Sequence, residues 1–305
     1  MSILVVGSVA FDAIETPFGK VDRCIGGSAT YFSVAASFFT HVDLVAVVGD
    51  DFGDDEVSVF KDRNINIDGL QRVPGAKTFF WSGEYGYDLN VAKTRDTQLN
   101  VFANFNPQLT ASQKKSEVLF LANIDPDLQL EVLRQVEKPR LIALDTMNYW
   151  ITSKKESLER VFREVDLIVI NEAEVRQFTG EAGLVRGARM ILELGPKALV
   201  VKRGEYGVLM VTKEAIFAAP AYPLETVFDP TGAGDTFAGG LLGYLASRGE
   251  LTDREFRRAI VFGSVLASFT VEKFSLDRLR EITLGEVLER YREFRALTHF
   301  EDHED

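Results

Sequence analysis

Short runs of apolar residues, rich in Val, Ile and Leu, alternate along the chain with segments of helical spacing. A continuous apolar run is typical of a strand buried on both faces, as in a parallel sheet covered by helices. The runs span residues 3–6, 42–48, 118–122, 141–144, 167–170 and 198–202. The alternation predicts an α/β fold with a doubly wound, mostly parallel sheet flanked by helices.

The segments between these runs repeat apolar residues at the spacing of one helix face. Residues 126–137 and 153–163 are predicted helices, and the second begins at a Ser/Thr cap. From Gly234 to the end, helical patterning dominates. The predicted inner faces consist of Leu128, Val132, Leu133 and Val136 in the first helix and of Leu158, Val161 and Phe162 in the second.

Two segments, residues 12–24 and 73–105, break the alternation. Residues 12–24 carry a Pro-Phe-Gly turn between two strand-like pieces, and residues 73–105 are crowded with Thr and aromatic residues while helix formers are sparse. We therefore expect antiparallel strands in both segments, with turns at Ser82-Gly83 and near residues 88–90. These strands would leave the parallel sheet and form a small separate sheet. The prediction divides the chain into a large domain, residues 1–11, 25–72 and 106–305, and a small one, residues 12–24 and 73–105. The charged end, residues 299–305, is expected to fray.

Composition and charge narrow the function classes. The 305 residues carry 34 Lys and Arg against 46 Asp and Glu, a net charge of −12. Such a surplus repels nucleic acid and acidic lipid, and no basic run offsets it. The single cysteine, Cys24, fits a reducing compartment. No apolar run approaches the ~18 residues of a membrane-spanning helix. We therefore expect a cytoplasmic protein that binds neither membrane nor nucleic acid.

The segment from residue 228 to 237, FDPTGAGDTF, is the strongest candidate for chemistry. Gly232 and Gly234 allow backbone N–H groups to converge at a helix N-terminus, where the free donors and the helix dipole favour an anion. Asp235 is an unexpected neighbour for a phosphate unless it accepts a proton from an attacking hydroxyl. The alternative is that Asp235 is only a helix N-cap, and spacing alone does not separate the two.

This segment resembles the C-terminal signature of the ribokinase-like (PfkB) carbohydrate kinases. The resemblance covers nearly the whole chain, and the two unusual β segments fall where this family inserts a lid sheet. The further matching elements are residues 7–12, Gly26-Gly27 with the helix that follows, residues 47–55, residues 171–174 and residues 201–207.

The resemblance implies an ATP-dependent sugar kinase that transfers the γ-phosphoryl group of Mg-ATP to a hydroxymethyl group. Asp235 would be the catalytic base, and Gly232, Ala233 and Gly234 would form the anion hole. In such a transfer the protein mainly positions groups and spreads charge.

On the nucleotide side, the resemblance assigns Asn171, Lys202, Gly204 and Gly207 to nucleotide binding and Glu174 to Mg²⁺, through water. The alternative for Asn171 and Glu174 is an ordinary capping box at a helix start. For Lys202 the alternative is a solvated surface cation.

Two residues before the anion hole, Asp229 and Thr231, match family positions that help to bind a monovalent cation. Potassium activation is therefore a hypothesis. Pro230 stands where the family often has Thr, which removes one hydrogen-bond donor but leaves these two neighbours in place.

On the acceptor side, Asp12 and the backbone of Gly26 and Gly27 should bind substrate hydroxyls. Tyr31 stands where the family usually has Asn, which replaces an amide by an aromatic face. Aromatic residues in the lid could stack on the base of a nucleoside, so the alternative is a nucleoside kinase of the same family. A catalytically silent, ligand-binding relative is a third reading. Exposed aromatic residues on the lid sheet also predict a homodimer formed through the lid.

Overall fold

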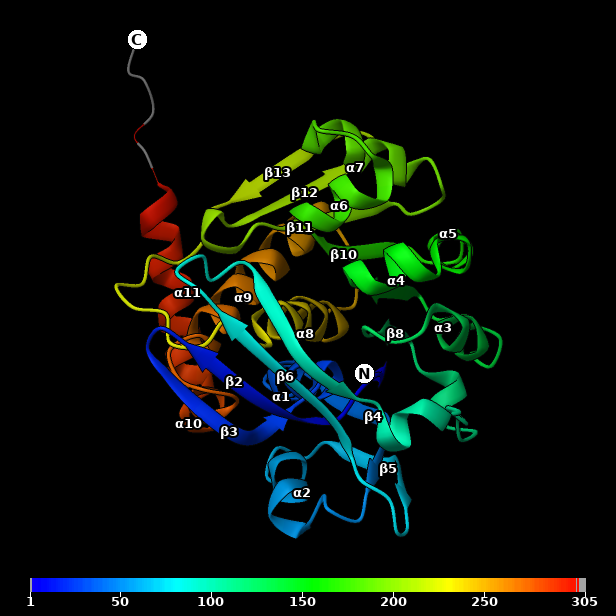
Figure 1. Ribbon diagram of the computed structural model, residues 1–305. Helices are drawn as coiled ribbons and strands as arrows, with labels where there is room; N and C mark the ends of the chain where they lie inside the picture. Colours follow the sequence, from blue (N-terminus) through cyan, green and yellow to red (C-terminus); the bar gives the residue numbers. More distant parts are fainter. Residues whose placement is uncertain (1, 300, 302–305) are drawn as a thin grey trace.

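The computed structural model describes residues 2–299 and residue 301, so the expected fraying of the charged end lies largely outside the described residues. Within the described part, the larger sheet has nine strands in the order β13-β12-β11-β10-β9-β8-β1-β4-β5 (Figure 1). Seven are parallel, and β12 and β13 join one edge antiparallel. The bounds are β1 Ser2–Val6, β4 His41–Gly49, β5 Asn66–Val73, β8 Val118–Leu121, β9 Leu141–Asp145, β10 Leu167–Asn171, β11 Ala198–Lys202, β12 Val208–Thr212 and β13 Ile216–Ala219.

All six predicted apolar runs are strands of this sheet, which confirms the predicted α/β fold class. The sequence analysis missed β5, β12 and β13. These strands lie at or near the two edges of the sheet. In β5 polar residues interrupt the apolar ones and only one residue is buried, so it lacks a continuous apolar run. Residues 208–211 and 216–219, in β12 and β13, are short apolar runs that the sequence analysis left unassigned.

Hydrophobic side chains form a core on each face of the sheet, because successive strand residues point to opposite sides. In β1, Ile3 and Val5 face one core while Leu4 and Val6 face the other. The first core is covered by α1, α2 and α8 to α11, and the second by α3 to α7. This double covering explains why the central strands read as unbroken apolar runs.

The helices are α1 Ser28–Ala36, α2 Asp54–Lys61, α3 Pro126–Leu133, α4 Asn148–Ser153, α5 Lys155–Phe162, α6 Glu172–Thr179, α7 Leu184–Leu192, α8 Ala233–Ala246, α9 Asp253–Thr270, α10 Asp277–Glu281 and α11 Leu284–Thr298. Short 3-10 helices span Asn100–Asn104, Gln113–Lys115 and Gly204–Tyr206. Two predicted helix boundaries were wrong. The first helix ends at Leu133 rather than at residue 137, and Ser153 ends α4 instead of capping α5, whose N-cap is Lys154.

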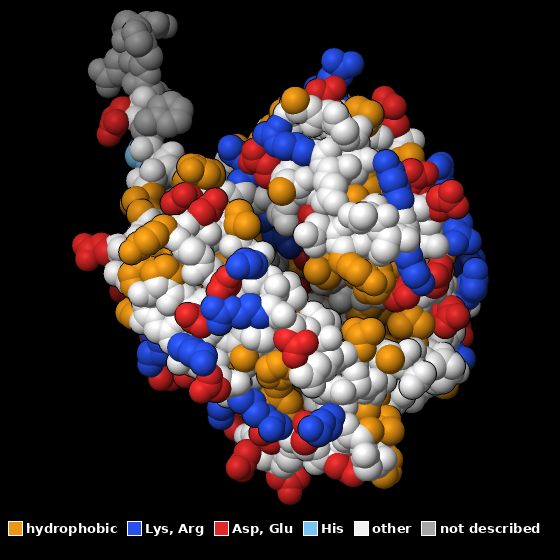
Figure 2. All heavy atoms as spheres, viewed as in Figure 1, with side chains coloured by type: hydrophobic (Ala, Val, Ile, Leu, Met, Phe, Trp, Pro, Cys, Tyr) orange, Lys and Arg blue, Asp and Glu red, His pale blue; other side chains and the backbone are white. Residues whose placement is uncertain are grey.

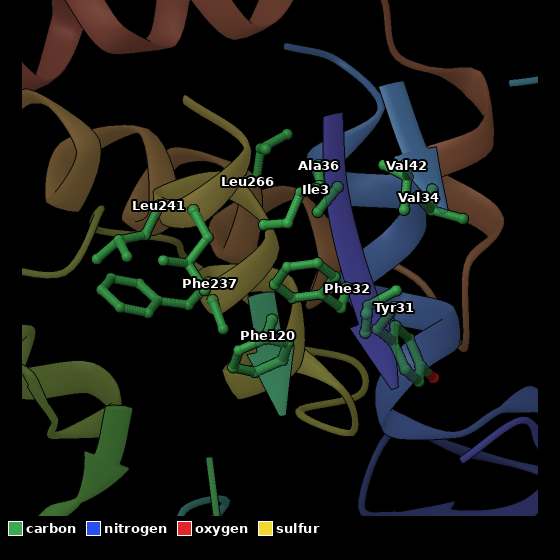
Figure 3. Close-up of a cluster of buried hydrophobic side chains, with 14 of the residues drawn as sticks. Ile3, Tyr31, Phe32, Val34, Ala36, Val42, Phe120, Phe237, Leu241 and Leu266 are labelled. Carbon is green, nitrogen blue, oxygen red and sulfur yellow. The ribbon is translucent and has the colours of Figure 1, made fainter. Parts of the chain in front are cut away.

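Helix α8 packs unusually close to its neighbours because it presents glycine to them. A methyl group at Gly239 or Gly243 would lie 2.4 Å from the Phe32 carbonyl oxygen or 2.7 Å from the Ala36 Cα, both in α1. On the other side, a methyl at Gly240 would lie 2.9 Å from the Gly263 Cα in α9. Backbone therefore meets backbone, and large side chains fill the space around the contact, as Figure 3 shows. The contact fixes the position of α8 between its two neighbours.

The smaller sheet has the strand order β3-β2-β6-β7, with β2 Ala10–Thr16, β3 Gly19–Gly26, β6 Phe79–Tyr85 and β7 Ala92–Gln98. This is the separate lid sheet that the sequence predicts. The turn near residues 88–90 is confirmed, since the Val91 N–H donates to the Asp88 carbonyl at 3.3 Å. The predicted turn at Ser82-Gly83 was wrong: β6 runs through it with a shift of register. The pairing of β2 with β6 is parallel, not antiparallel.

Candidate active site

The turn before α8 brings a glycine, a helix N-terminus and a carboxylate together. Gly232 has φ 73° and is the residue before the helix, and a methyl group there would lie 2.4 Å from the ring of Tyr31. A left-handed backbone in such close contact favours glycine. The N–H of Ala233 donates to the Pro230 carbonyl at 3.2 Å and closes the turn. Asp235 lies in the first helical turn, so the reading of Asp235 as an N-cap was wrong, because Gly232 holds that position.

The carboxyl of Asp235 lies among other charges inside the protein. Burial, together with the charge of Asp145, raises its pKa to about 7, although Lys202 acts in the opposite direction. A carboxylate with a pKa near neutrality can accept a proton and remain ionised in much of the population at pH 7. The first turn of α8 therefore combines N–H donors with a group that can act as a base.

Asp145, the last residue of β9, is a site residue that the sequence analysis missed. Its Oδ2 lies 2.6 Å from the Nζ of Lys202, the last residue of β11, and its side chain is 3% exposed. Burial lowers the pKa of Lys202, but the carboxylates of Asp145, Glu174 and Asp235 outweigh it and raise that pKa overall. The available signal was an acidic residue directly after the apolar run 141–144, because polar residues at the carboxyl ends of parallel strands point to the ligand-binding edge.

Asn171 and Glu174 form the reciprocal capping box that the sequence analysis left as an alternative. The Asn171 side chain accepts from the Glu174 N–H at 2.8 Å, and the Glu174 carboxylate accepts from the Asn171 N–H at 2.9 Å. Burial raises the pKa of Glu174 to about 7, with Lys202 lowering it and Asp145 raising it. The pair therefore caps α6 at the edge where Lys202 and Asp235 lie. A role in holding Mg²⁺ stays a prediction.

A cavity of about 470 Å³ opens beside this edge, a volume within the range of small-molecule sites. Figure 2 shows the face of the molecule hollowed there, with basic side chains inside the hollow. The loop between β6 and β7 forms one wall, and a methyl at Gly204 would lie 1.6 Å from Asn90 Oδ1 in that loop. The predicted site residues that line the cavity are Lys202, Gly204, Gly207, Ala233 and Gly234.

Asp12 comes from β2 of the lid sheet and is 4% exposed. A methyl group at Gly26, on the neighbouring strand β3, would lie 1.9 Å from Asp12 Oδ2, so the carboxylate occupies the space that a side chain would take. Burial, together with the charges of Asp229 and Asp235, raises the pKa of Asp12 to about 8. Gly27 precedes α1 with φ 97°. Asp12 therefore lies close enough to the turn before α8 to interact with its charges.

Tyr31 is 1% exposed, and its ring lies beneath Gly232. Figure 3 shows its oxygen pointing away from the hydrophobic cluster of Phe32 and Phe120. Burial raises the pKa of the Tyr31 hydroxyl well above its usual value, with Asp229 and Asp12 adding to the effect. The ring thus supports the turn before α8, and its contact with a substrate stays a prediction.

Asp229 holds two loops together below this turn. One carboxylate oxygen accepts from the Thr231 N–H and the other from the Ser275 N–H, both at 2.9 Å. The Thr231 hydroxyl donates to the Tyr85 hydroxyl at 3.2 Å, which links the turn to β6 of the lid. The lid sheet and the turn before α8 are therefore directly linked.

Two kinds of site are absent from the described part of the chain. Residues 2–299 and 301 contain no group of three or more His, Cys, Asp or Glu side chains arranged to hold a metal ion by themselves. No helix in these ranges has both the length and the hydropathy needed to cross a bilayer.

Comparison with known proteins places the chain among kinases. A cytidine kinase of Thermococcus kodakarensis is 30% identical over 259 residues, covering 81% of this chain and 90% of that protein. A deoxyribokinase of Salmonella typhi is 26% identical and covers 87% of this chain and 92% of its own length. The crystal structure of a nucleoside kinase of Methanocaldococcus jannaschii superposes with a TM-score of 0.78 at 23% identity, covering 96% and 98% of the two chains. Residues 2–281 match the family model of the pfkB family carbohydrate kinases, and the chain belongs to that family.

Proposed function

We propose that this protein transfers the γ-phosphoryl group of Mg-ATP to a hydroxymethyl group of a sugar or a sugar derivative. The observation that carries the proposal is the position of Asp235, in the first turn of α8 with its pKa raised to about 7. The cavity beside it, lined by Lys202 and Gly234, supplies room for a nucleotide and a positive charge for its phosphates.

In this mechanism the oxygen of the acceptor hydroxyl bonds to the γ-phosphorus, and Asp235 accepts the proton that this hydroxyl loses. The bond between that phosphorus and the bridging oxygen breaks, and ADP leaves. The N–H groups at Gly232 and Gly234 and the dipole of α8 stabilise the negative charge on the phosphoryl oxygens. Ala233 contributes mainly by closing the turn, because its N–H already donates to Pro230. A positioned base of this kind is worth roughly 10²–10⁴-fold in rate.

Magnesium fits this site as an ion that arrives with the nucleotide. Without three protein ligands among the described residues, it would be held by the phosphates, by water and by Glu174 through water, as Mg²⁺ commonly is. When bound, it would neutralise charge on the phosphates. Asn171 would orient Glu174 through their reciprocal hydrogen bonds.

Potassium activation remains part of the proposal, through Asp229 and Thr231. Asp229 fixes the backbone at Thr231 and Ser275, so carbonyl oxygens of these loops are held in place for a cation. Equal turnover rates in potassium and in a large organic cation would remove this element.

A nucleoside acceptor is the second candidate, and one feature of the lid favours it. Trp81 of β6 pairs directly with Asp12 of β2, so both side chains lie on the same face of the lid. The indole lies against Gly83 and donates to the Thr94 hydroxyl at 3.2 Å. An aromatic ring on the same face as Asp12 suits a ribose that carries a base. The cytidine kinase at 30% identity is in line with this candidate.

The test is ADP release with Mg-ATP over a panel of sugars, sugar acids and nucleosides, with Asp235→Asn as the control. Turnover on a sugar that is lost in the variant is the expected result. Turnover only on nucleosides selects the second candidate. No turnover, with ligands still raising the melting temperature, contradicts the kinase and favours the silent relative.

The proposal includes a cytoplasmic location, in line with one lone cysteine, and a homodimer through the lid. Strands β3 and β7 end the lid sheet in the described part, and Val91 beside β7 is 60% exposed. Unpaired strand edges of this kind can pair with a second copy. A monomeric mass by light scattering at micromolar concentration would exclude the dimer.

A further inference from the structure

An ion pair crosses the carboxyl-terminal end of the large sheet. Asp145 ends β9 and Lys202 ends β11, and β10 lies between these two strands. For Nζ to reach Oδ2 at 2.6 Å, the lysine stem must extend over the end of β10, where Asn171 begins the cap of α6. The two side chains are 18% and 3% exposed.

The lysine stem runs directly beneath the catalytic turn. A methyl group at Gly234 would lie 3.0 Å from Lys202 Nζ and 3.5 Å from its Cδ and Cε. The absence of a side chain at Gly234 therefore lets the ammonium lie against the start of α8, the place where the proposed function needs positive charge.

Asp145 is itself held rigidly. Its Oδ1 accepts from the Thr146 N–H at 2.7 Å, and its carbonyl oxygen accepts from the fully buried amide of Gln129 at 3.2 Å. A buried ion pair seldom adds net stability, because removing both charges from water costs about as much as their attraction returns. A role in function explains the rigid, buried pair better than a role in stability.

Lys202 has other carboxylates to choose from. Glu174 and Asp235 both attract it, as the raised pKa of the ammonium reflects. A direct pair between Lys202 and Asp235 would tie up the base. The ion pair that Lys202 makes is instead with Asp145, at 2.6 Å.

We propose that Asp145 is a positioning residue, which holds the Lys202 ammonium beneath Gly234 so that it meets the transferring phosphoryl group while Asp235 stays free to accept the proton. The inference rests on the proposed function. It adds a residue whose effect on the transferring phosphoryl group passes through Lys202. Preorganised charge of this kind saves the cost of arranging it during the reaction.

The experiment compares Asp145→Asn, Lys202→Met and the double variant in the full-length protein, using the acceptor on which the wild type turns over. We expect Asp145→Asn to lower kcat by about 10- to 100-fold, because small misplacements of a positioned group have effects of this size. Since Asp145 acts through Lys202, the double variant should be no slower than Lys202→Met alone. Additive losses would contradict the inference.

The pH profile of kcat/KM supplies a readout that a merely structural residue would not move. Charged and titratable groups that interact with Asp235 are Asp12 of β2, Tyr85 of β6, Asp145 of β9, Glu174 of α6 and Lys202 of β11. Losing the negative charge of Asp145 should move the acid limb to lower pH, and losing the positive charge of Lys202 should move it to higher pH. If the acid limb stays in place in both variants, or shifts in the same direction in both, the proposal is overturned.

A second readout does not depend on turnover. An amine-reactive ester, followed by mass spectrometry of the peptide that contains Lys202, should label Lys202 faster in Asp145→Asn than in the wild type. Equal labelling rates would mean that Asp145 does not hold the ammonium.

The matched control is Lys197→Met, which breaks the ion pair of Lys197 with Asp166 at the amino-terminal ends of β11 and β10. Its kcat and pH profile should equal those of the wild type. If the wild type and Asp235→Asn behave as the proposed function requires but Asp145→Asn equals the wild type, this inference alone fails. If the wild type phosphorylates nothing in the panel, the proposed function fails first and the inference with it.

Discussion

The two edges of the parallel sheet carry the same kind of ion pair in opposite surroundings. At the carboxyl-terminal edge, Asp145 and Lys202 meet at 2.6 Å with side chains 3% and 18% exposed. At the amino-terminal edge, Asp166 before β10 and Lys197 before β11 meet at 2.8 Å with side chains 24% and 81% exposed. The first pair is shielded from water and lies among further carboxylates, whereas the second is solvated.

The polar groups of the amino-terminal edge serve the backbone instead. Asp166 accepts from the Ile142 N–H at 2.9 Å, and Arg140 donates to the carbonyls of Leu245, Ala246 and Arg248 at the end of α8. Helix α8 therefore connects the carboxyl-terminal edge, which carries the candidate site, with the amino-terminal edge, where polar side chains bind the backbone. Substitutions at the first edge should change catalysis, and substitutions at the second should change stability.

The largest expected effect comes from Gly232, the residue before α8. Gly232→Ala should lower kcat by at least about 100-fold, the size of effect seen when an oxyanion donor is lost. The reason is the positive φ of Gly232 and the 2.4 Å approach to Tyr31. Steady-state kinetics provide the measurement. The matched control is Gly249→Ala, since nothing lies within 4 Å of a methyl group there. A similar loss of rate in both variants would break the comparison of the two edges.

At the other end of the helix, Arg140→Met should lower the free energy of unfolding by about 2 kcal/mol, because a charged donor is removed from carbonyls at a helix C-terminus. The value of kcat should be unchanged. Chemical denaturation measures the first quantity, and kinetics well below the midpoint measure the second. A fall in kcat without a loss of stability would mean that this end of α8 also controls the chemistry.

The buried carboxyl groups of the candidate site should also make the stability of the protein depend on pH. Folding raises the pKa of Asp12 from 3.8 to about 8, that of Glu174 from 4.5 to about 7 and that of Asp235 from 3.8 to about 7. The folded state therefore binds more protons than the unfolded state between these values, so their contribution to stability is lost as pH rises through 7 and 8.

We expect the melting temperature of the ligand-free protein to fall by several degrees between pH 5.5 and pH 8.5, within the window that these pKa values define. Asp12→Asn should flatten that slope and raise the melting temperature at the alkaline end. Differential scanning calorimetry tests both. If Asp12→Asn leaves the slope of melting temperature against pH unaltered, folding does not raise the pKa of Asp12.

The smallest effect should come from the exposed pair. Lys197→Met should change the free energy of unfolding by less than about 0.5 kcal/mol, because a solvated ion pair gains little over its separated charges. Denaturant titration at low and high salt measures it. A larger, salt-sensitive loss would make the two edges more alike than their exposures indicate.

The sequence predicted the parts of the fold that depend on continuous burial. The central strands were predicted because both of their faces are covered and their residues form continuous apolar runs. Strands β5, β12 and β13 were not predicted. The lid was predicted from its composition. The predicted antiparallel pairing is correct for β2 with β3 and for β6 with β7. It was wrong for β2 with β6, because these strands lie far apart in the chain and parallel pairing of that kind leaves no local signal.

The candidate site followed the same division. Residues within one short segment, such as Gly232 and Asp235, could be found because turn and helix chemistry is local. Asp145 could not, because its meaning depends on Lys202, 57 residues away and on a strand that is not its neighbour. A contact between distant strand ends becomes visible only when the sheet order is known.

The glycine contacts of α8 bear on how such a protein changes over evolutionary time. Backbone packs against backbone at Gly239, Gly240 and Gly243. A larger side chain at any of these positions would therefore shift the helix that carries Asp235. In the lid, the close contacts of Gly26 with Asp12 and of Gly83 with Trp81 join backbone to side chains rather than backbone to backbone. Under the proposed function, selection for a new acceptor would therefore act on β2, β3, β6 and β7 while the helix that carries Asp235 is inherited unchanged.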